Sequence, residues 1–353
     1  MSFYGFRAFK EIDHRQQDVA VLYKFPNGGH DRHLDETIDE LTKRRLPPDR
    51  VLIVCPKGLE VQVAAEFADM SDATKDRLRA VSHVVLAFFD HRGKIDPSTL
   101  NQLYAPDGDW QLSDNDFGYF VDQGMEEIIR ETGTRMTAPV GYVFRKPSEK
   151  SNRIFIRTGN MLKNPPAPAV IFHAMTRTLP VGFKRMYIDS FTILSIALTY
   201  QKCMADLADA CKISYQEPTI TNFHSYDMDD NLTFEAADDY IILISASSSG
   251  GLADKLVSER FARGANIFHL LMFSDKKSLR ERVVYFKHEP NDKLPVVDGV
   301  QKIITIPGEE FMASHGETRT VDIKLDHLIA NERKLFKDDF YQEALGLNPF
   351  ASG

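Results

Sequence analysis

The stretch that decides the fold spans residues 240–273 and reads YIILISASSSGGLADKLVSERFARGANIFHLLMF. An apolar run opens it, a loop of small residues follows, and a helix-forming segment then leads into a second apolar run. Strand, helix and strand in direct succession form the unit from which parallel sheets are built. The run IILI carries no polar side chain, which is typical of a central strand buried on both faces. The stretch therefore predicts an α/β fold with a parallel sheet.

The same alternation continues on both sides of this stretch. Runs rich in β-branched and aromatic residues predict further strands at 139–146, 152–159, 185–191 and 219–226. Apolar residues at helical spacing predict helices at 121–132, 166–179 and 193–210. The tail predicts strands at 302–308 and 321–328 and a helix at 331–347. The central part of the chain is thus expected to be a set of βαβ units.

The first part of the chain predicts a different organisation. Helical candidates lie at 33–45, 58–70 and 74–92, and the first of them stops before the sequence LPPD, where prolines prevent continuation. Segment 104–118 is rich in Asp, Gly, Pro and Asn and is typical of a linker. We therefore predict three parts: a mostly helical domain at 1–115, an α/β domain at 116–288 and a C-terminal extension at 289–353.

Composition narrows the function classes. The chain has 353 residues and a formal charge of −8, so no direct binding to nucleic acid through a basic surface is expected. Its three cysteines contain no CxxC pair, which argues against a disulfide framework or a structural zinc site. No apolar run is long enough to cross a bilayer. We expect a cytoplasmic protein with no membrane partner.

The small-residue loop is the main candidate site. Ser247, Ser248 and Ser249 bring hydroxyl donors, and Gly250 and Gly251 let backbone amides approach a ligand. The helix that follows adds partial positive charge, so the loop predicts a site for an anion such as a phosphate. The chain has neither a GxxxxGK[ST] loop nor a GxGxxG fingerprint at this place. A serine that merely caps the helix in a tight turn is the alternative.

The order of these motifs resembles the type I phosphoribosyltransferases over residues 118–285. SSSGGLA stands where that family has its phosphate loop, and RGAN stands at the helix exit. RMYIDSFTILSIALTYQKC stands where the family has its diphosphate-contacting strand, loop and helix. RIFIRTGNML resembles the hood strand of orotate phosphoribosyltransferases, with Thr158 and Gly159 in place of Ser-Gly. Sugar isomerase domains, which hold a sugar phosphate with serines, are the rival fold.

This resemblance implies a pocket at the carboxyl edge of the strands. Its ligand would be a nucleotide, a sugar phosphate or phosphoribosyl diphosphate, accompanied by Mg²⁺ in the case of a diphosphate. The resemblance places ligand-binding residues in the loop, in the hood and in the upstream loop: Ser245, Ser247, Ser248, Ser249, Gly250, Gly251, Ser195, Arg157 and Thr158.

The chain departs from the family at the residues that would stabilise the charge developed in the reaction. Ser245 and Ala246 occupy the positions of the two acidic residues that the family places before the loop, and Leu252 replaces a threonine. Asp189 is a carboxylate at the upstream strand end, where it is the candidate catalytic residue or caps the next helix. One hypothesis is a degenerate protein that binds its ligand without the parent reaction. The other is an active transferase or N-glycosidase with a rebuilt site.

The combination of an eroded transferase domain with an added helical module resembles effector or regulatory subunits of bacterial antiviral defence systems. A structural subunit without a ligand, docking through the N-terminal domain to a protein partner, is a third alternative.

Other parts of the sequence also contain residues of types that can form functional sites. The sequence GGHDRHLDE holds His30, Asp31, His33 and Asp35, which predicts either a metal site or the start of a helix, and we favour the helix. Cys55 and His173 are expected to be buried core residues. The polar loop around His315 predicts either a lid over the pocket or an ordinary exposed loop.

Overall fold

The computed structural model describes residues 3–12, 15–24, 34–43, 46–106, 108–139, 142–145, 151–164, 167–229, 232–234, 239–274, 277–289 and 302–305. The chain divides into two compact units. Unit 1 holds residues 1–136 and 156–292, and unit 2 holds residues 137–155 and 293–353. Within the described ranges, no helix combines the length and the apolar character that a bilayer crossing requires.

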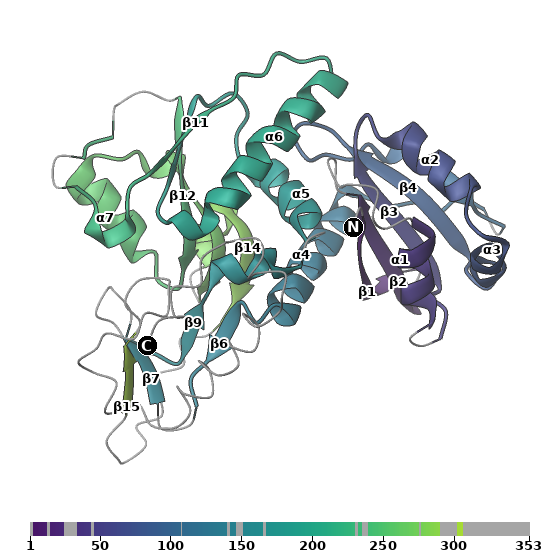
Figure 1. Cartoon of the computed structure of the whole chain (residues 1–353), viewed down its shortest axis with the longest axis horizontal. Coiled ribbons are helices and arrows are strands. Elements are labelled where there is room, and N and C mark those ends of the chain that lie inside the picture. Colours follow the sequence, from purple (N-terminus) through teal and green to yellow (C-terminus); the bar gives the residue numbers. More distant parts are fainter. Residues whose placement is uncertain are drawn as a thin grey trace, which may run out of the picture. The chain divides into compact units, whose positions relative to one another are not determined.

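Unit 1 contains two five-stranded sheets, of which the first is N-terminal (Figure 1). Its strands follow the order β1 (Phe3–Ile12), β2 (Arg15–Lys24), β3 (Arg50–Pro56), β4 (His83–Phe89) and β5 (Asn101–Tyr104). The strands β2, β3 and β4 are parallel, while β1 and β5 lie antiparallel at the two edges. The helices of this part are α1 (Leu34–Lys43), α2 (Glu60–Ala68) and α3 (Asp72–Leu78).

The prediction of a mostly helical N-terminal domain is therefore wrong. The helices expected at 33–45 and 58–70 are confirmed as α1 and α2, but the third candidate is split. Its start forms α3, whereas His83–Phe89 forms the buried strand β4. Two β-branched residues, Val84 and Val85, favour the extended chain there because they pack well on a pleated surface between strands. The predicted domain boundaries remain predictions.

Two helices pack in the interior of unit 1. These are α4 (Asp114–Glu131) and α5 (Pro168–Thr178), and α5 contacts β1, β2 and β14. A Cβ added at Gly124 of α4 would lie 2.9 Å from side-chain atoms of Phe6 and Val170, so the helix approaches its neighbours closely. A capping box between Ser113 and Asp116 starts α4. The linker predicted at 104–118 is thus wrong in its second half.

His173 on α5 is a core residue, as predicted. Its ring stacks on Phe89 with a centroid distance of 4.1 Å, and its Nε2 donates to the Gly93 carbonyl at 3.0 Å. Nδ1 lies 3.4 Å from the hydroxyl of Tyr23. Burial, followed by the charge of Arg177, lowers the pKa of His173 from 6.5 to about 3. The imidazole is therefore neutral and structural in the folded chain.

This lowered pKa predicts acid sensitivity. Below pH 6.5 the unfolded chain binds a proton on His173 that the folded chain does not, so stability is present above that pH and is lost as pH falls toward 3. We expect the contribution to be about 2 kcal/mol between pH 6.5 and 5, at roughly 1.4 kcal/mol per pH unit. Urea unfolding at both pH values measures it. A His173→Gln variant should lose about this much of the pH dependence, and an unchanged slope would contradict the assignment.

The second sheet of unit 1 is entirely parallel. Its order is β11 (Thr219–Asn222), β10 (Arg185–Ile188), β12 (Tyr240–Ser247), β13 (Ile267–Ser274) and β14 (Val283–His288). The α/β fold, the parallel sheet and the central place of the IILI strand are confirmed. The helices α6 (Leu194–Ala210) and α7 (Gly251–Arg260) lie on opposite sides of this sheet in Figure 1. Leu252 and Leu256 of α7 pack with Ile242 and Ile244 of β12.

Short elements complete the chain. In unit 2, β7 (Tyr142–Arg145) pairs in parallel with β15 (Lys302–Thr305) and antiparallel with β8 (Ser151–Asn152). β6 (Arg135–Thr137) and β9 (Ile154–Ile156) form a two-stranded sheet. The 3₁₀ turns are η1 (Pro97–Thr99), η2 (Thr158–Lys163), η3 (Phe191–Ile193), η4 (Ser225–Asp227), η5 (Gly264–Asn266) and η6 (Lys277–Arg282). The elements predicted at 321–328 and 331–347 and the loop around His315 lie outside the described residues.

Candidate functional site

The second sheet reverses its winding between β10 and β12. From β10 the chain passes through α6 to β11 on one side, whereas from β12 it passes through α7 to β13 on the other. The two connections diverge at the carboxyl ends of β10 and β12, and open α/β sheets bind ligands at such a point. Asp189 directly follows β10, and Ser245 lies near the end of β12.

Asp189 and Ser245 are joined across this point. One carboxylate oxygen of Asp189 accepts from the Ser245 backbone N–H at 2.8 Å, and the other accepts from the Ser245 hydroxyl at 3.0 Å. Both residues are buried, with 4% and 1% of their surface exposed. The cap before α6 comes from Ser190, whose hydroxyl accepts from the Thr192 N–H at 3.2 Å. Asp189 therefore ties two strand ends together, and its roles as a catalytic residue or as a cap of the next helix stay predictions.

The serine loop is held by its own side chains. The hydroxyl of Ser247 accepts from the Gly250 N–H at 2.9 Å, and Gly250 has a φ of 79°. Gly250 is the N-cap residue of α7, which means that no serine occupies this capping position. Since glycine has no side chain to cap with, the first-turn amides of α7 face the loop without a side-chain cap from that position. Ser248 and Ser249 of the loop are both half-buried.

Two further residues border the loop and were missed by sequence reasoning. A Cβ added at Gly251 would lie 3.5 Å from both the Tyr226 hydroxyl and the Ser249 hydroxyl. The Lys255 ammonium lies 5.7 Å from the centre of the Tyr226 ring. Burial, followed by the negative charges of Asp189 and Asp254, raises the pKa of Tyr226. Lys255 could have been found from its spacing, because it stands four residues after Gly251 on the same helix.

The predicted hood segment lies beside the turn that follows β10. A Cβ added at Gly159 of η2 would lie 3.5 Å from the Thr192 Cβ in η3. Thr158 is fully buried, and its hydroxyl has no hydrogen-bond partner among the described residues. Arg157 is half-buried, and Ser195 is exposed on the first turn of α6. Of the three segments predicted to hold the ligand, the hood and the upstream loop are thus neighbours in space.

Among the described residues, no three acidic, histidine or cysteine side chains gather in a way that could hold a metal ion. Asp35 lies in the first turn of α1, and its carboxylate accepts from the Ser71 hydroxyl at 3.1 Å. Its hydrogen bond from Thr74 is the main cause that lowers its pKa. This agrees with our preference for the start of a helix. His30, Asp31 and His33 lie outside the described residues.

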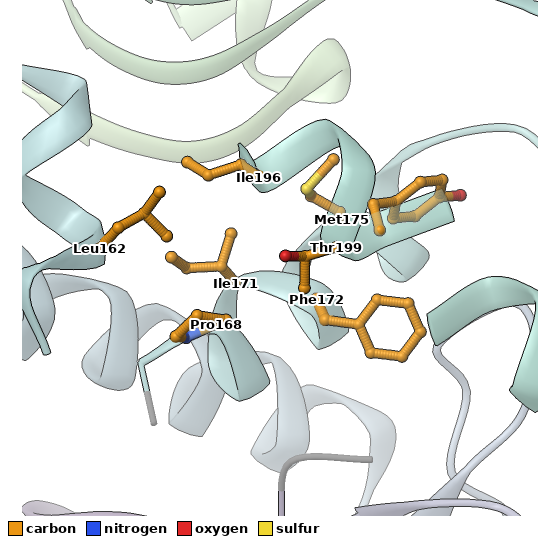
Figure 2. A pocket seen from close by; sticks show the side chains of 8 residues that line it. Leu162, Pro168, Ile171, Phe172, Met175, Ile196 and Thr199 are labelled. Carbon is orange, nitrogen blue, oxygen red and sulfur yellow. The ribbon is translucent and has the colours of Figure 1, made fainter. Parts of the chain in front are cut away.

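An apolar cleft lies between η2, α5 and α6 (Figure 2). It is lined by Leu162, Pro168, Ile171, Phe172, Met175, Ile196, Thr199 and Tyr200. Its walls are almost entirely apolar, so this cleft offers few hydrogen-bond donors to a phosphate. None of the predicted site residues lines it. Cys55 is likewise no site: burial raises the pKa of its thiol, as expected for a core cysteine.

The comparisons with known proteins show little similarity. No protein-family model matches the chain, and no curated protein matches it. Among solved structures, UMP synthase of Leishmania donovani is similar with a TM-score of 0.32 and 12% sequence identity. The match covers 67% of this chain and 55% of that protein, so the chain spans little more than half of its length.

Proposed function

We propose that this chain is a degenerate phosphoribosyltransferase-like protein that binds a nucleotide or sugar phosphate at the serine loop. The observation that carries the proposal is the Asp189–Ser245 bridge at the point where the sheet reverses its winding. The bridge fixes the strand ends on which the loop stands. An open α/β sheet is expected to bind its ligand at that edge.

The electrostatics of the loop favour an anion. The first turn of α7 presents backbone N–H groups and partial positive charge, and Gly250 leaves that turn without a side-chain cap of its own. Lys255 adds a full positive charge near Tyr226, which itself borders Gly251. We assign phosphate binding to the amides of this turn, with Ser248, Ser249 and Lys255 as additional donors.

The parent transfer reaction is not part of the proposal. Ribosyl transfer develops positive charge that the family's acidic pair would stabilise, and Ser245 and Ala246 carry no charge at those positions. Asp189 is the carboxylate to which we would assign surviving chemistry, but its two oxygens accept hydrogen bonds from Ser245. Mg²⁺ stays a prediction from the resemblance, in which it accompanies a diphosphate ligand.

A Gly251→Glu variant tests the site directly. Gly251 has ordinary backbone angles, and its added Cβ would meet nothing closer than 3.5 Å, so the substitution adds a negative charge at the first turn of α7 without a clash at the Cβ. We expect the variant to lower affinity by about 30-fold or more, because charge-assisted hydrogen bonds to a phosphate are replaced by repulsion. Titration calorimetry with phosphoribosyl diphosphate, ribose 5-phosphate and nucleoside monophosphates, with and without MgCl₂, measures the change.

The matched control is Val257→Glu. Val257 lies on the same helix and is exposed, so the variant adds the same charge away from the loop. It should bind as tightly as the unaltered chain. An equal loss of affinity in both variants, or no binding to any of these ligands, would refute the phosphate site. The role in antiviral defence, a cytoplasmic location and a protein partner remain predictions from the sequence.

A further inference from the structure

Two exposed aromatic rings stand next to the Asp189–Ser245 bridge. Phe191 follows β10 and is 62% exposed, although a phenyl ring of this size is usually buried. His224 follows β11 and is exposed as well. The two ring centres lie 5.6 Å apart with the planes at 69°. An aromatic pair is thus presented to solvent at the carboxyl edge of the sheet.

His224 is held in place by its neighbours. Its φ of 61° and the φ of 54° at Ser225 are left-handed, which is rare for residues other than glycine. The side-chain oxygen of Asn222 accepts from the His224 N–H at 3.1 Å, and the Asn222 amide nitrogen lies 3.4 Å from the His224 Nδ1. Such strained positions concentrate at functional sites, where the surrounding structure maintains them.

We propose that the exposed ring of Phe191, supported by the His224 ring that lies at a steep angle to it, forms a stacking platform for a nucleobase, so that the ligand of this protein is a nucleotide and not a bare sugar phosphate. This inference rests on the proposed phosphate site. The platform stands over β11 and β10, and the serine loop stands over β12. Neighbouring strands lie about 5 Å apart, so one small molecule can reach both. Aromatic rings stack on any base, because every base has a π-face.

The test compares ligands with and without a base. Adenosine and uridine monophosphates and ribose 5-phosphate are titrated into the full chain and into Phe191→Ala. We expect the variant to bind both nucleotides about tenfold more weakly, because one stacking partner is lost, and to bind ribose 5-phosphate unchanged. Phe191→Tyr keeps the ring and should retain nucleotide affinity. Val181→Ala removes another exposed apolar side chain, 43% exposed and ahead of β10, and should change nothing.

Two results would overturn the platform while leaving the phosphate site intact. The first is that nucleotides bind the unaltered chain no more tightly than ribose 5-phosphate does. The second is that Phe191→Ala weakens all three ligands equally. In either case ribose 5-phosphate still binds the unaltered chain, and this binding is still lost in Gly251→Glu. If ribose 5-phosphate and the nucleotides all fail to bind, the platform and the phosphate site are both refuted.

Discussion

Replacing Gly93 with alanine is expected to lower the free energy of unfolding by about 4 kcal/mol. Gly93 has a φ of 66°, and an added Cβ would lie 2.6 Å from the backbone nitrogen of Arg177. A left-handed alanine costs about 1–2 kcal/mol, and the clash with helix backbone adds about 1–3 kcal/mol. The shift would also move the Gly93 carbonyl, which accepts from His173. Urea unfolding followed by circular dichroism measures the loss.

Gly133 provides the matched control for this prediction. Its φ of 64° is nearly the same as that of Gly93, but an added Cβ would meet nothing within 4 Å. Gly133→Ala should therefore cost only the backbone strain, about 1–2 kcal/mol. Equal losses in the two variants would show that Gly93 is selected for its backbone angles alone and that the contact of this turn with α5 carries little stability.

Asp189→Ala is expected to destabilise the chain by about 3 kcal/mol. The variant leaves the Ser245 N–H and hydroxyl without the carboxylate that accepts from both, in a place where little water can replace it. An unsatisfied buried polar group costs about 1–3 kcal/mol, and more when its lost partner is charged. Chemical unfolding at neutral pH gives the value.

A double-mutant cycle separates the bridge from other effects of Asp189. Ser245→Ala removes the hydroxyl but keeps the backbone N–H, so the coupling between the two substitutions isolates the side-chain hydrogen bond. We expect a coupling of about 1–2 kcal/mol. A coupling near zero would mean that the stability comes from the backbone contact or from other partners of Asp189.

The second sheet of unit 1 and its helices could be predicted because their sequence patterns are unambiguous. The run IILI at 241–244 is apolar throughout, and helices such as 193–210 repeat apolar residues at helical spacing. The N-terminal sheet was missed for a physical reason. Within 74–92 the end of α3 leads into β4 without a glycine or proline between them. The helical spacing of the first part therefore masks the strand pattern of the second. The end of β1 and the start of β2, which the hairpin joins, contain no apolar run, so the sequence does not mark them as strands.

Only the part of the site that is continuous in sequence could be predicted. The loop with Ser247 and Gly250 is continuous in sequence, so its strand, turn and helix could be anticipated. The partner of Asp189 lies 56 residues away, and the platform joins residues that follow two different strands. The bridge depends on β12 lying beside β10, and the platform depends on β11 lying on the other side of β10, so both are a matter of strand order in the sheet. A single sequence does not fix this order, because several topologies bury the same apolar strands.

The pairing of β7 with β15 has a consequence for synthesis on the ribosome. Tyr142 pairs with Lys302, so the partner of β7 is made 160 residues after it. At about 5–20 residues per second, β7 waits roughly 10–30 s for that partner. The strands of the second sheet of unit 1 are all made within this interval, between residues 185 and 288. Unit 1 can therefore complete its second sheet before β15 is made, and unit 2 is expected to be the last part of the chain to complete its strand pairing.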